Sequence, residues 1–421
     1  MSKVACAAMA AAFALLQAPN ASAASDADLA EIRKQIQSLK DEYEARIRAL
    51  EDKLKDAQDR AAAPAPLAST GGANAGLAAF NPAISLILNG TYANLSQDPD
   101  HFAIAGFRPA GEIGPGRRGF SLGETELALS ANIDERFAGQ ATISLTPENS
   151  VAVEEAYAIY TAAPLGLAPK IGRFFSGIGY LNEQHAHAWD FVDAPLAYQA
   201  FLGGQYSNDG VQVKWVAPLE QYIELGAEAG NGASFPGSAR NKNGVGSGAL
   251  YAHTGGDIGE SHNWRAGVSW LHTRSDEPHA KDETGIVDFV WKWAPNGNAR
   301  ATNFKIQGEY FRRREAGDVA TDSPIASGAA SYKAWQSGLY LQGVYQFMPL
   351  WRAGVRYDRL DPGALDPFRA RKYTAMIDWS PSEFSRVRLQ FARSETLPEL
   401  KDNQFFVQYI LSLGAHGAHK Y

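Results

Sequence analysis

The side chains with the clearest chemical potential are basic residues at every second position near the end of the chain. In the stretch 351–358 (WRAGVRYD), one face carries Trp, Ala, Val and Tyr, and the other carries Arg, Gly, Arg and Asp. The same alternation places Lys372, Arg386 and Arg388 beside Arg352 and Arg356 on a polar face. A guanidinium group holds an oxyanion through a fixed fork of N–H donors. A row of such groups in water would therefore let an anion step between weak sites.

A second group of polar side chains lies in the segment of about 176–207. Its members are acids and histidines, namely Glu183, His185, His187, Asp190 and Asp193. If this segment faces the basic wall across water, the two charged surfaces set up a transverse field that orients polar solutes. The alternative, in which both sets of charges are solvated filling of a wide interior, stays open at this point.

Alternation also assigns charged residues to the same interior on other parts of the chain. On the middle stretches it predicts inward basic residues, namely Lys214, Arg265, Lys292 and Lys305. On the early and middle stretches it predicts inward acids, namely Glu124, Glu126, Glu154, Glu224 and Glu228. These acids would repel anions, so the pore is expected to be only mildly selective for anions over cations.

Metal binding and catalysis are considered and not predicted. His185 and His187 would share one face of a strand, with Glu183 or Asp190 as further ligands. Histidine is common in irregular loops, so we predict no metal site and no cofactor. The chain has no Gly-x-Ser-x-Gly nucleophile elbow, and the histidines have no obvious serine partner at a strand end. No enzyme activity is predicted.

The elements that must position these residues are strands of about ten residues with alternating apolar and polar positions. About sixteen are predicted, an even number as in bacterial barrels, near 83–94, 119–133, 135–148, 150–162, 168–176, 208–218, 220–231, 247–257, 261–274, 284–295, 301–314, 331–346, 349–360, 369–380, 384–395 and 402–415. Trp351, Val355, Tyr373, Ile377, Trp379, Val387, Leu389 and Phe391 fall on the apolar face. A closed antiparallel β-barrel, with lipid outside and water inside, satisfies every backbone group. The predicted fold class is therefore all-β, a transmembrane barrel preceded by a short helical coiled coil.

The connections support this prediction because short and long gaps alternate along the chain. Longer loops are predicted at 95–118, 176–207, 231–246 and 314–330, between short turns. Beyond the first two dozen residues, no apolar run approaches the roughly 18 residues that a spanning helix needs. The net charge of −7 argues against a nucleic-acid partner.

The first eighty residues divide into three predicted parts. Lys3, the apolar run 4–16 and the small residues 21–23 are typical of a secretory signal peptide, over 1–24. Residues 25–60 carry apolar positions three and four apart with one phase shift, which predicts a periplasmic coiled coil. Residues 61–82 form an Ala/Pro/Gly linker, and 83–421 form the barrel. The only cysteine, Cys6, lies in the signal.

Two stretches carry a resemblance to a known family. The first is 172–182 (GRFFSGIGYLN), followed by 189–191 (WDF) and Pro195. The second is the final strand, where Phe405, Val407, Tyr409, Leu411 and Leu413 share one phase and the chain ends on Tyr421. The chain resembles Gram-negative outer-membrane porins, and in particular the phosphate-selective porin (OprO/OprP-like) superfamily. The resemblance implies a sixteen-stranded trimeric barrel whose third loop folds inward; it carries no substrate motif.

Together these features predict a porin in the outer membrane of a Gram-negative bacterium, with its N-terminal coiled coil in the periplasm. The expected function is passive diffusion of small hydrophilic solutes or ions through a homotrimer, with mild anion selectivity. The predicted pore-lining residues are Glu183, His185, His187, Asp190, Asp193, Arg352, Arg356, Lys372, Arg386 and Arg388. Two alternatives remain, a structural barrel that tethers the envelope through its coil and a barrel enzyme. A plugged transporter needs a globular N-terminal domain that about 60 residues cannot supply.

Overall fold

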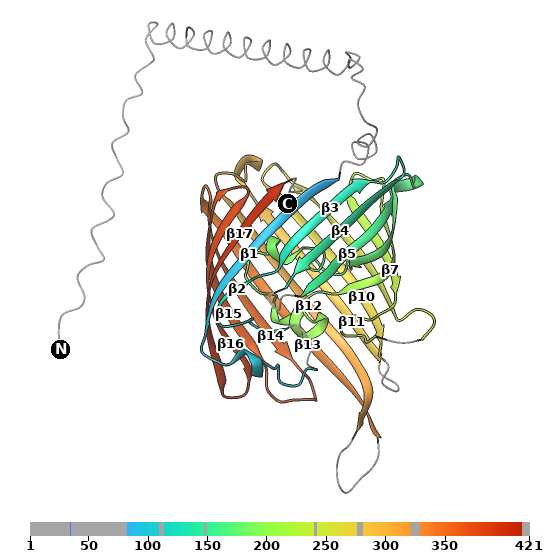
Figure 1. The fold of residues 1–421 in the computed structure, drawn as a ribbon, viewed down its shortest axis with the longest axis vertical. Helices are drawn as coiled ribbons and strands as arrows, with labels where there is room; N and C mark the ends of the chain where they lie inside the picture. The colour runs from blue at the N-terminus through green and yellow to red at the C-terminus, as the bar shows by residue number, and fades with distance from the viewer. Residues whose placement is uncertain are drawn as a thin grey trace, which may run out of the picture. The chain divides into compact units, whose positions relative to one another are not determined.

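The strands of the protein form one antiparallel sheet that closes on itself (Figure 1). A computed structural model describes residue 34 and residues 82–108, 113–146, 150–239, 242–275, 281–320 and 329–414. From the third strand onward each strand pairs with the next one in the chain, and β1 (Ala83–Leu95) pairs with β17 (Leu400–Gly414) from Ser85↔Gly414 to Leu95↔Gln404. That last pairing leaves the sheet without an edge.

The sheet has seventeen strands in the described ranges but sixteen positions around the ring. The reason is that β2 (Gly119–Leu122) and β3 (Thr125–Asn132) both pair with β1, one after the other along its length. The two together are the single strand predicted over 119–133. The prediction of a sixteen-stranded antiparallel barrel is confirmed.

The remaining elements follow in chain order. The other strands are β4 (Phe137–Leu145), β5 (Val151–Tyr160), β6 (Leu167–Phe175), β7 (Ser207–Val216), β8 (Tyr222–Gly230), β9 (Ser247–Ile258), β10 (His262–Arg274), β11 (Lys281–Trp293), β12 (Asn303–Ala320), β13 (Ala329–Met348), β14 (Trp351–Asp361), β15 (Arg371–Ser382) and β16 (Ser385–Leu397). Short 3-10 helices occur at η1 (Pro99–His101), η2 (Pro164–Gly166), η3 (Ala186–Ala188) and η4 (Pro295–Gly297), and one α-helix occurs at α3 (Leu196–Leu202).

The two faces of the late strands separate as the alternation predicts. All eight apolar side chains assigned to the outer face of β14 to β16 are exposed, from Trp351 at 36% to Val355 at 64%. The alternate positions, such as Arg356, Lys372 and Arg388, are buried inside. In a period-2 strand one correct assignment fixes the whole strand. The outer surface of these strands is therefore apolar.

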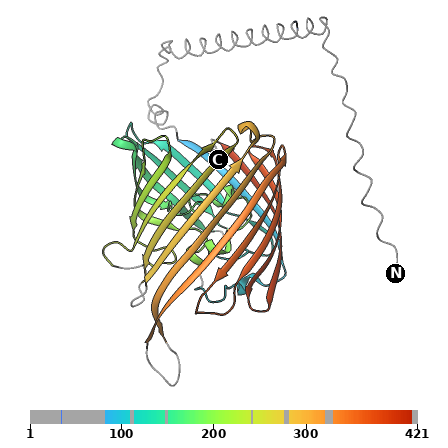
Figure 2. The same ribbon diagram turned by 180° about the vertical axis from the view of Figure 1, so that it is seen from behind.

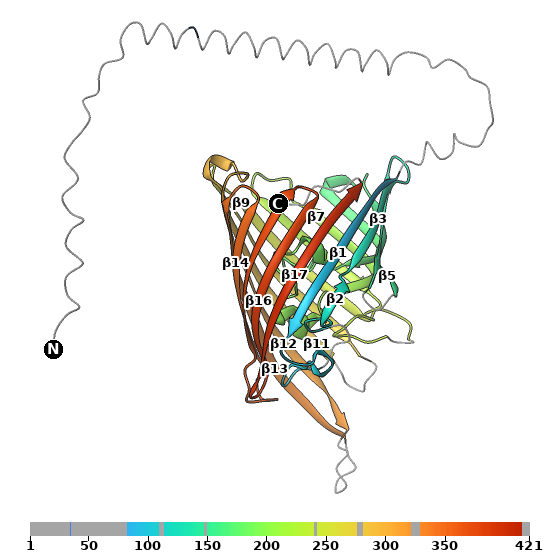
Figure 3. The same cartoon turned by 60° about the vertical axis from the view of Figure 1, so that its left-hand side comes forward.

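One hairpin is longer than the sequence pattern indicates. β12 has 18 residues and β13 has 20, and their pairing continues to Ala320↔Ala329. Figures 2 and 3 show this hairpin reaching beyond the other strands at the end of the barrel that carries the long loops. Residues 314–320 and 329–330 of the predicted loop 314–330 are therefore strand. A two-stranded ribbon outside the barrel needs no apolar face, so the alternation that marks the other strands is weak there.

Residues 176–206, between β6 and β7, lie inside the barrel and are called the inward segment below (Figure 1). Its helix α3 is buried along its whole length and ends at Gly203, whose φ of 68° forms a left-handed C-cap. The helix packs in an apolar core with side chains from the barrel wall. This core includes Ile178, Leu196, Tyr198 and Phe201 from the segment, and Leu271, Ile286, Phe311, Tyr340 and Leu360 from the wall.

The predicted signal peptide, the linker apart from Pro82 and the coiled coil apart from Lys34 lie outside the described residues. So does the C-terminal stretch 415–421. Among the residues that are described, no helix is both long and apolar enough to cross a membrane.

Candidate functional site

The inward segment presents its two aspartates to the late strands. Asp190 lies 2.5 Å from the Nζ of Lys305 and 3.2 Å from the Nη1 of Arg352, and it accepts a 3.0 Å hydrogen bond from Gln342. Asp378 of β15 holds the other side of Arg352 at 2.6 Å. Burial alone would raise the pKa of Asp190, but the two cations hold it well below its ordinary value.

Asp193 makes an equivalent connection three residues further along the chain. It accepts from Nη2 of Arg356 at 3.0 Å and from Gln390 at 2.9 Å, and it forms an ion pair with Lys372. The Nε of Arg356 donates to Asp358 at 3.0 Å. Burial works to raise the pKa of Asp193, yet Lys372 and Arg356 lower it well below its usual range. A buried carboxylate held by several donors stays charged.

Asp358 extends this network to α3. Its Oδ1 accepts a 2.9 Å hydrogen bond from the backbone N–H of Leu196, the first residue of the helix. An acid near a helix N-terminus satisfies a backbone donor that has no partner within the helix. The aspartate network therefore fixes both the position of the inward segment and the start of its helix.

These contacts correct the prediction of charged surfaces that face each other across water. Asp190 and Asp193 touch the cations directly, and Arg356, Lys372 and Arg388 are buried between the segment and the wall. Arg388 donates to the carbonyl oxygen of Trp189 at 2.7 Å. The sequence shows which residues face inward but not how far the loop reaches. Of the five basic residues predicted on the late strands, only Arg352 and Arg386 keep partial exposure.

Glu309 of β12 is an anchor that the sequence pattern did not single out. Its carboxylate accepts from the backbone N–H groups of Tyr180 and Leu181, both at 3.1 Å, and from the hydroxyls of Tyr198 at 2.9 Å and Tyr340 at 2.6 Å. Alternation alone assigns Glu309 to the inner face, two positions before Phe311. Its role depends on contacts with a segment more than a hundred residues away.

Gly179 makes the approach to Glu309 possible. Its φ is 67°, and a Cβ at this position would lie 2.3 Å from Oε2 of Glu309. A side chain would be both strained by the backbone conformation and in collision with the carboxylate. The glycine in the stretch 172–182 thus has a packing reason in this chain.

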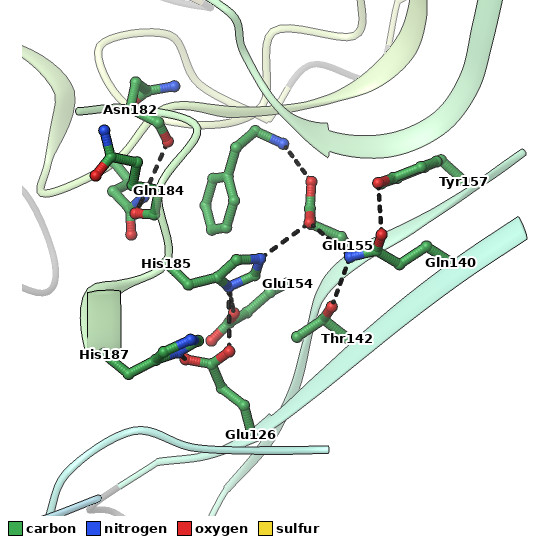
Figure 4. Close-up of polar contacts among 12 residues, drawn as sticks. Glu126, Gln140, Thr142, Glu154, Glu155, Tyr157, Asn182, Gln184, His185 and His187 are labelled. Carbon is green, nitrogen blue, oxygen red and sulfur yellow. Dashed lines mark hydrogen bonds and ion pairs between the residues drawn. The ribbon is translucent and has the colours of Figure 1, made fainter. Parts of the chain in front are cut away.

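The two histidines of the inward segment face the early strands, away from the aspartate network. Figure 4 shows His185 between Glu126, Glu154 and Glu155. His185 Nδ1 lies 3.2 Å from Glu126 and 3.1 Å from Glu154, while its Nε2 lies 3.1 Å from Glu155. His187 Nδ1 lies 2.7 Å from the other oxygen of Glu126. Burial opposes a charge on His185, but the carboxylates raise its pKa well above the ordinary value.

A β-bulge brings two consecutive glutamates to this cluster. Between β4 and β5, Thr142 pairs with Glu155 and Ile143 pairs with Val153, so Glu154 has no partner in the ladder. An extra residue in one strand lets neighbouring side chains point to the same face. Simple alternation would place either Glu154 or Glu155 outside, and only the bulge brings both inside.

Glu183 is not part of this cluster. It forms an ion pair with Lys214 at 2.5 Å. Burial acts to raise the pKa of Glu183, but Lys214 lowers it. The ligand set considered from the sequence, His185 and His187 with Glu183 or Asp190, is therefore wrong in its acids. Residues 186–188 form the turn η3 rather than a strand.

Six basic side chains line the inner wall near the short turns and are called the basic cluster. They are Lys214, Arg265, Lys292, Lys305, Arg352 and Arg386, all partly exposed. Lys292 and Lys305 are directly opposite each other across β11 and β12. Like charges at such a position are unfavourable unless something negative lies near. Asp190 contacts Lys305, and Glu224 faces Lys214 and Arg265.

Comparison with known proteins starts from sequence. No protein-family profile matches the chain. A protein of Aquifex aeolicus (strain VF5), described as uncharacterized, is 31% identical over 388 residues, which are 82% of this chain and 80% of the relative. The chain belongs to the family of this Aquifex protein. The similarity spans most of both chains, so the family shares more than one isolated segment.

Solved structures of outer-membrane proteins share the fold of this chain. The anion-selective porin from Comamonas acidovorans matches 79% of this chain and 100% of its own, with a TM-score of 0.53 and 8% identity. The outer membrane channel DcaP of Acinetobacter baumannii matches 79% and 97%, with a TM-score of 0.51 and 15% identity. The trimer form of OmpT, an outer membrane protein of Vibrio cholerae, matches 79% and 99%, at 0.51 and 10%. The chain therefore has the barrel fold seen in these outer-membrane proteins.

Proposed function

We propose that the protein is a porin of the outer membrane, through which small hydrophilic solutes and ions diffuse passively, with a mild preference for anions. The observation that carries this proposal is the basic cluster on the inner wall, with Lys292 directly opposite Lys305. A fold shared with porins supports the channel, and the apolar outer face of the strands suits a bilayer.

The balance of charges explains why the preference is expected to be mild. The basic cluster attracts anions to the short-turn end of the interior. Carboxylates lie among its members, since Glu183 contacts Lys214 and Asp190 contacts both Lys305 and Arg352. They cancel part of the positive potential without reversing it.

Finer features of the proposal follow the resemblance. We place the chain near the phosphate-selective porin (OprO/OprP-like) superfamily, without assigning phosphate as its solute. A homotrimer is proposed, and the trimer form of the Vibrio cholerae protein supports it. Residues 1–24 are proposed as a signal peptide, 25–60 as a periplasmic coiled coil and 61–82 as a linker. No enzyme activity is proposed.

The test is single-channel recording of the purified protein in a planar bilayer, with the reversal potential measured under a KCl gradient. Stable steps with an anion-selective potential are expected. The variants Lys292→Glu and Arg386→Glu should each shift the potential toward cations, because both reverse a partly exposed charge. Lys401→Glu is the matched control, since Lys401 is exposed at the long-loop end of β17.

Two outcomes would overturn this proposal. If a correctly folded, heat-modifiable barrel shows no conductance steps in the bilayer, the protein is not a channel. Reversal potentials that move equally in the control and in the two variants would remove the basic cluster as the source of selectivity.

A further inference from the structure

The cluster around His185 has more acceptors than its donors can serve. His185 carries one hydrogen at most on Nδ1, yet this nitrogen lies within 3.2 Å of oxygens from both Glu126 and Glu154. The other oxygen of Glu154, Oε1, is buried and receives no hydrogen bond from an N–H group or a hydroxyl in the part of the chain that is described; the remaining partner of the Glu154 carboxylate is the carboxyl group of Glu124. The Glu154 side chain is only 9% exposed. Two carboxyl groups in contact repel each other when both are charged, so both can stay charged only if a cation lies near.

The charges in the cluster are also out of balance. Glu126, Glu154 and Glu155 converge on one imidazole, and Glu124 lies within electrostatic reach of Glu126 and Glu154. Even if His185 and His187 are both protonated, negative charge remains in excess. Buried carboxylates of this kind are normally paired or coordinate a metal ion.

The distances fit a common centre. Single ligand atoms of Glu126, Glu154 and His185 all lie within 4.8 Å of one another, and the nitrogen-to-oxygen distances are 3.1 and 3.2 Å. Ligand atoms that each bind a small divalent ion at about 2.0–2.2 Å are about 3 Å apart. We propose that Glu126, Glu154 and Nδ1 of His185 bind one first-row divalent transition-metal ion, of the class represented by Zn²⁺.

The residues behind these three ligands have the arrangement that such a site needs. With Nδ1 bound to the ion, His185 keeps its proton on Nε2 and donates it to Glu155 at 3.1 Å. A carboxylate behind a ligating histidine fixes the tautomer and the orientation of the ring. His187 donates to the second oxygen of Glu126 at 2.7 Å, which orients that ligand. Imidazole and carboxylate donors together suit Zn²⁺ and its neighbours better than Ca²⁺ or Mg²⁺.

An ion here would tie the inward segment to β3 and β5. Glu126 belongs to β3, Glu154 to the bulge of β5, and His185 to the segment itself. The aspartate network holds the opposite side of the segment. The ion is therefore a structural clamp, and its site does not depend on whether the barrel conducts.

The test measures metal content of the full-length mature protein in detergent. The protein is stripped with a chelator, incubated with Zn²⁺, desalted and analysed, and the affinity is measured by calorimetry. One ion per chain is expected. Glu154→Gln should weaken binding by at least about tenfold, since loss of even a residue behind a ligand costs 10–100-fold. Glu224→Gln is the matched control, because Glu224 pairs with His253 at 3.0 Å in a separate part of the interior.

Binding of equal strength in the wild type and in Glu154→Gln would overturn the proposal, as would an equal loss in Glu224→Gln. So would absence of zinc binding, since the cluster would then be neutralised by protons. If Glu154→Gln fails to fold, X-ray absorption of the zinc-loaded wild type decides. One imidazole among oxygen ligands is expected, and either no imidazole or several would reject the site.

Discussion

The variant Asp193→Asn tests how the inward segment is held. Asp193 contacts Arg356 and Lys372, whose side chains are 1% and 3% exposed, so its loss leaves two buried cations short of a partner. Breaking a buried ion pair in this way costs about 3–5 kcal/mol. The strand pairing of the barrel does not involve this side chain. The cost should therefore fall on the position of the segment and not on the barrel as a whole.

Amide hydrogen exchange followed by mass spectrometry measures this cost directly. Protection of the peptide that covers α3 reports local opening. Since each 1.4 kcal/mol is a factor of ten, exchange of this peptide should accelerate by about 100- to 4,000-fold. Peptides from β14 and β15 away from the contact should keep their protection.

The control is an ion pair that is more exposed to solvent. Glu283 lies 3.4 Å from Arg314, and both side chains are about two-fifths exposed, so Glu283→Gln should change local stability by less than about 1 kcal/mol. If Asp193→Asn accelerates exchange of the α3 peptide less than about tenfold, the aspartate network is not what holds the segment. Equal acceleration in the control would lead to the same conclusion.

Three further predictions concern the same interior and the outer face. Glu309→Gln should cost about 1–3 kcal/mol and speed exchange at residues 180–181, because an amide cannot accept all four hydrogen bonds that reach the carboxylate; unchanged exchange would show that the anchor is dispensable. Since the pKa values of Asp190 and Asp193 are lowered in the folded protein, their contribution to stability is present above the ordinary value of 3.8 and is lost only as the pH falls through the lowered values. Corrected for intrinsic rates, the excess exchange of the α3 peptide in Asp193→Asn over the wild type should therefore be the same at pH 7 and pH 5, and a smaller excess at pH 5 would contradict the charge pairing. Trp351 and Trp379, both exposed on the outer face, should be quenched by brominated lipid in a reconstituted bilayer, and protection of either would reverse the assigned side of its strand.

The barrel could be predicted from sequence because the pattern that defines each strand lies within a short stretch of the chain. Alternation over ten residues defines a strand and its two faces, and the prediction held for β14 to β16 residue by residue. The limits of the β12–β13 hairpin were missed because residues beyond the barrel wall have no core or lipid to face. The alternation of apolar and polar residues therefore cannot predict strand residues that extend beyond the barrel.

The candidate site could be predicted only in part. The sequence identifies Asp193 and Arg356 as inward and charged, but they are separated by 163 positions, and their contact depends on the path of the inward segment. The position of Glu154 depends on a single extra residue in β5, and a strict alternation of faces does not predict where such a bulge occurs. Pairing partners and bulges are properties of the closed ring, and one strand alone does not contain them.

The inward segment lies between walls of opposite charge, with its aspartates against cations and its histidines against glutamates. If the segment were turned around, Asp190 and Asp193 would meet Glu126 and Glu154, and the histidines would meet Arg356 and Lys372. Repulsion between these like charges would then disfavour the reversed arrangement. The charges on the two walls therefore favour one orientation of the inward segment inside the barrel over the reversed one.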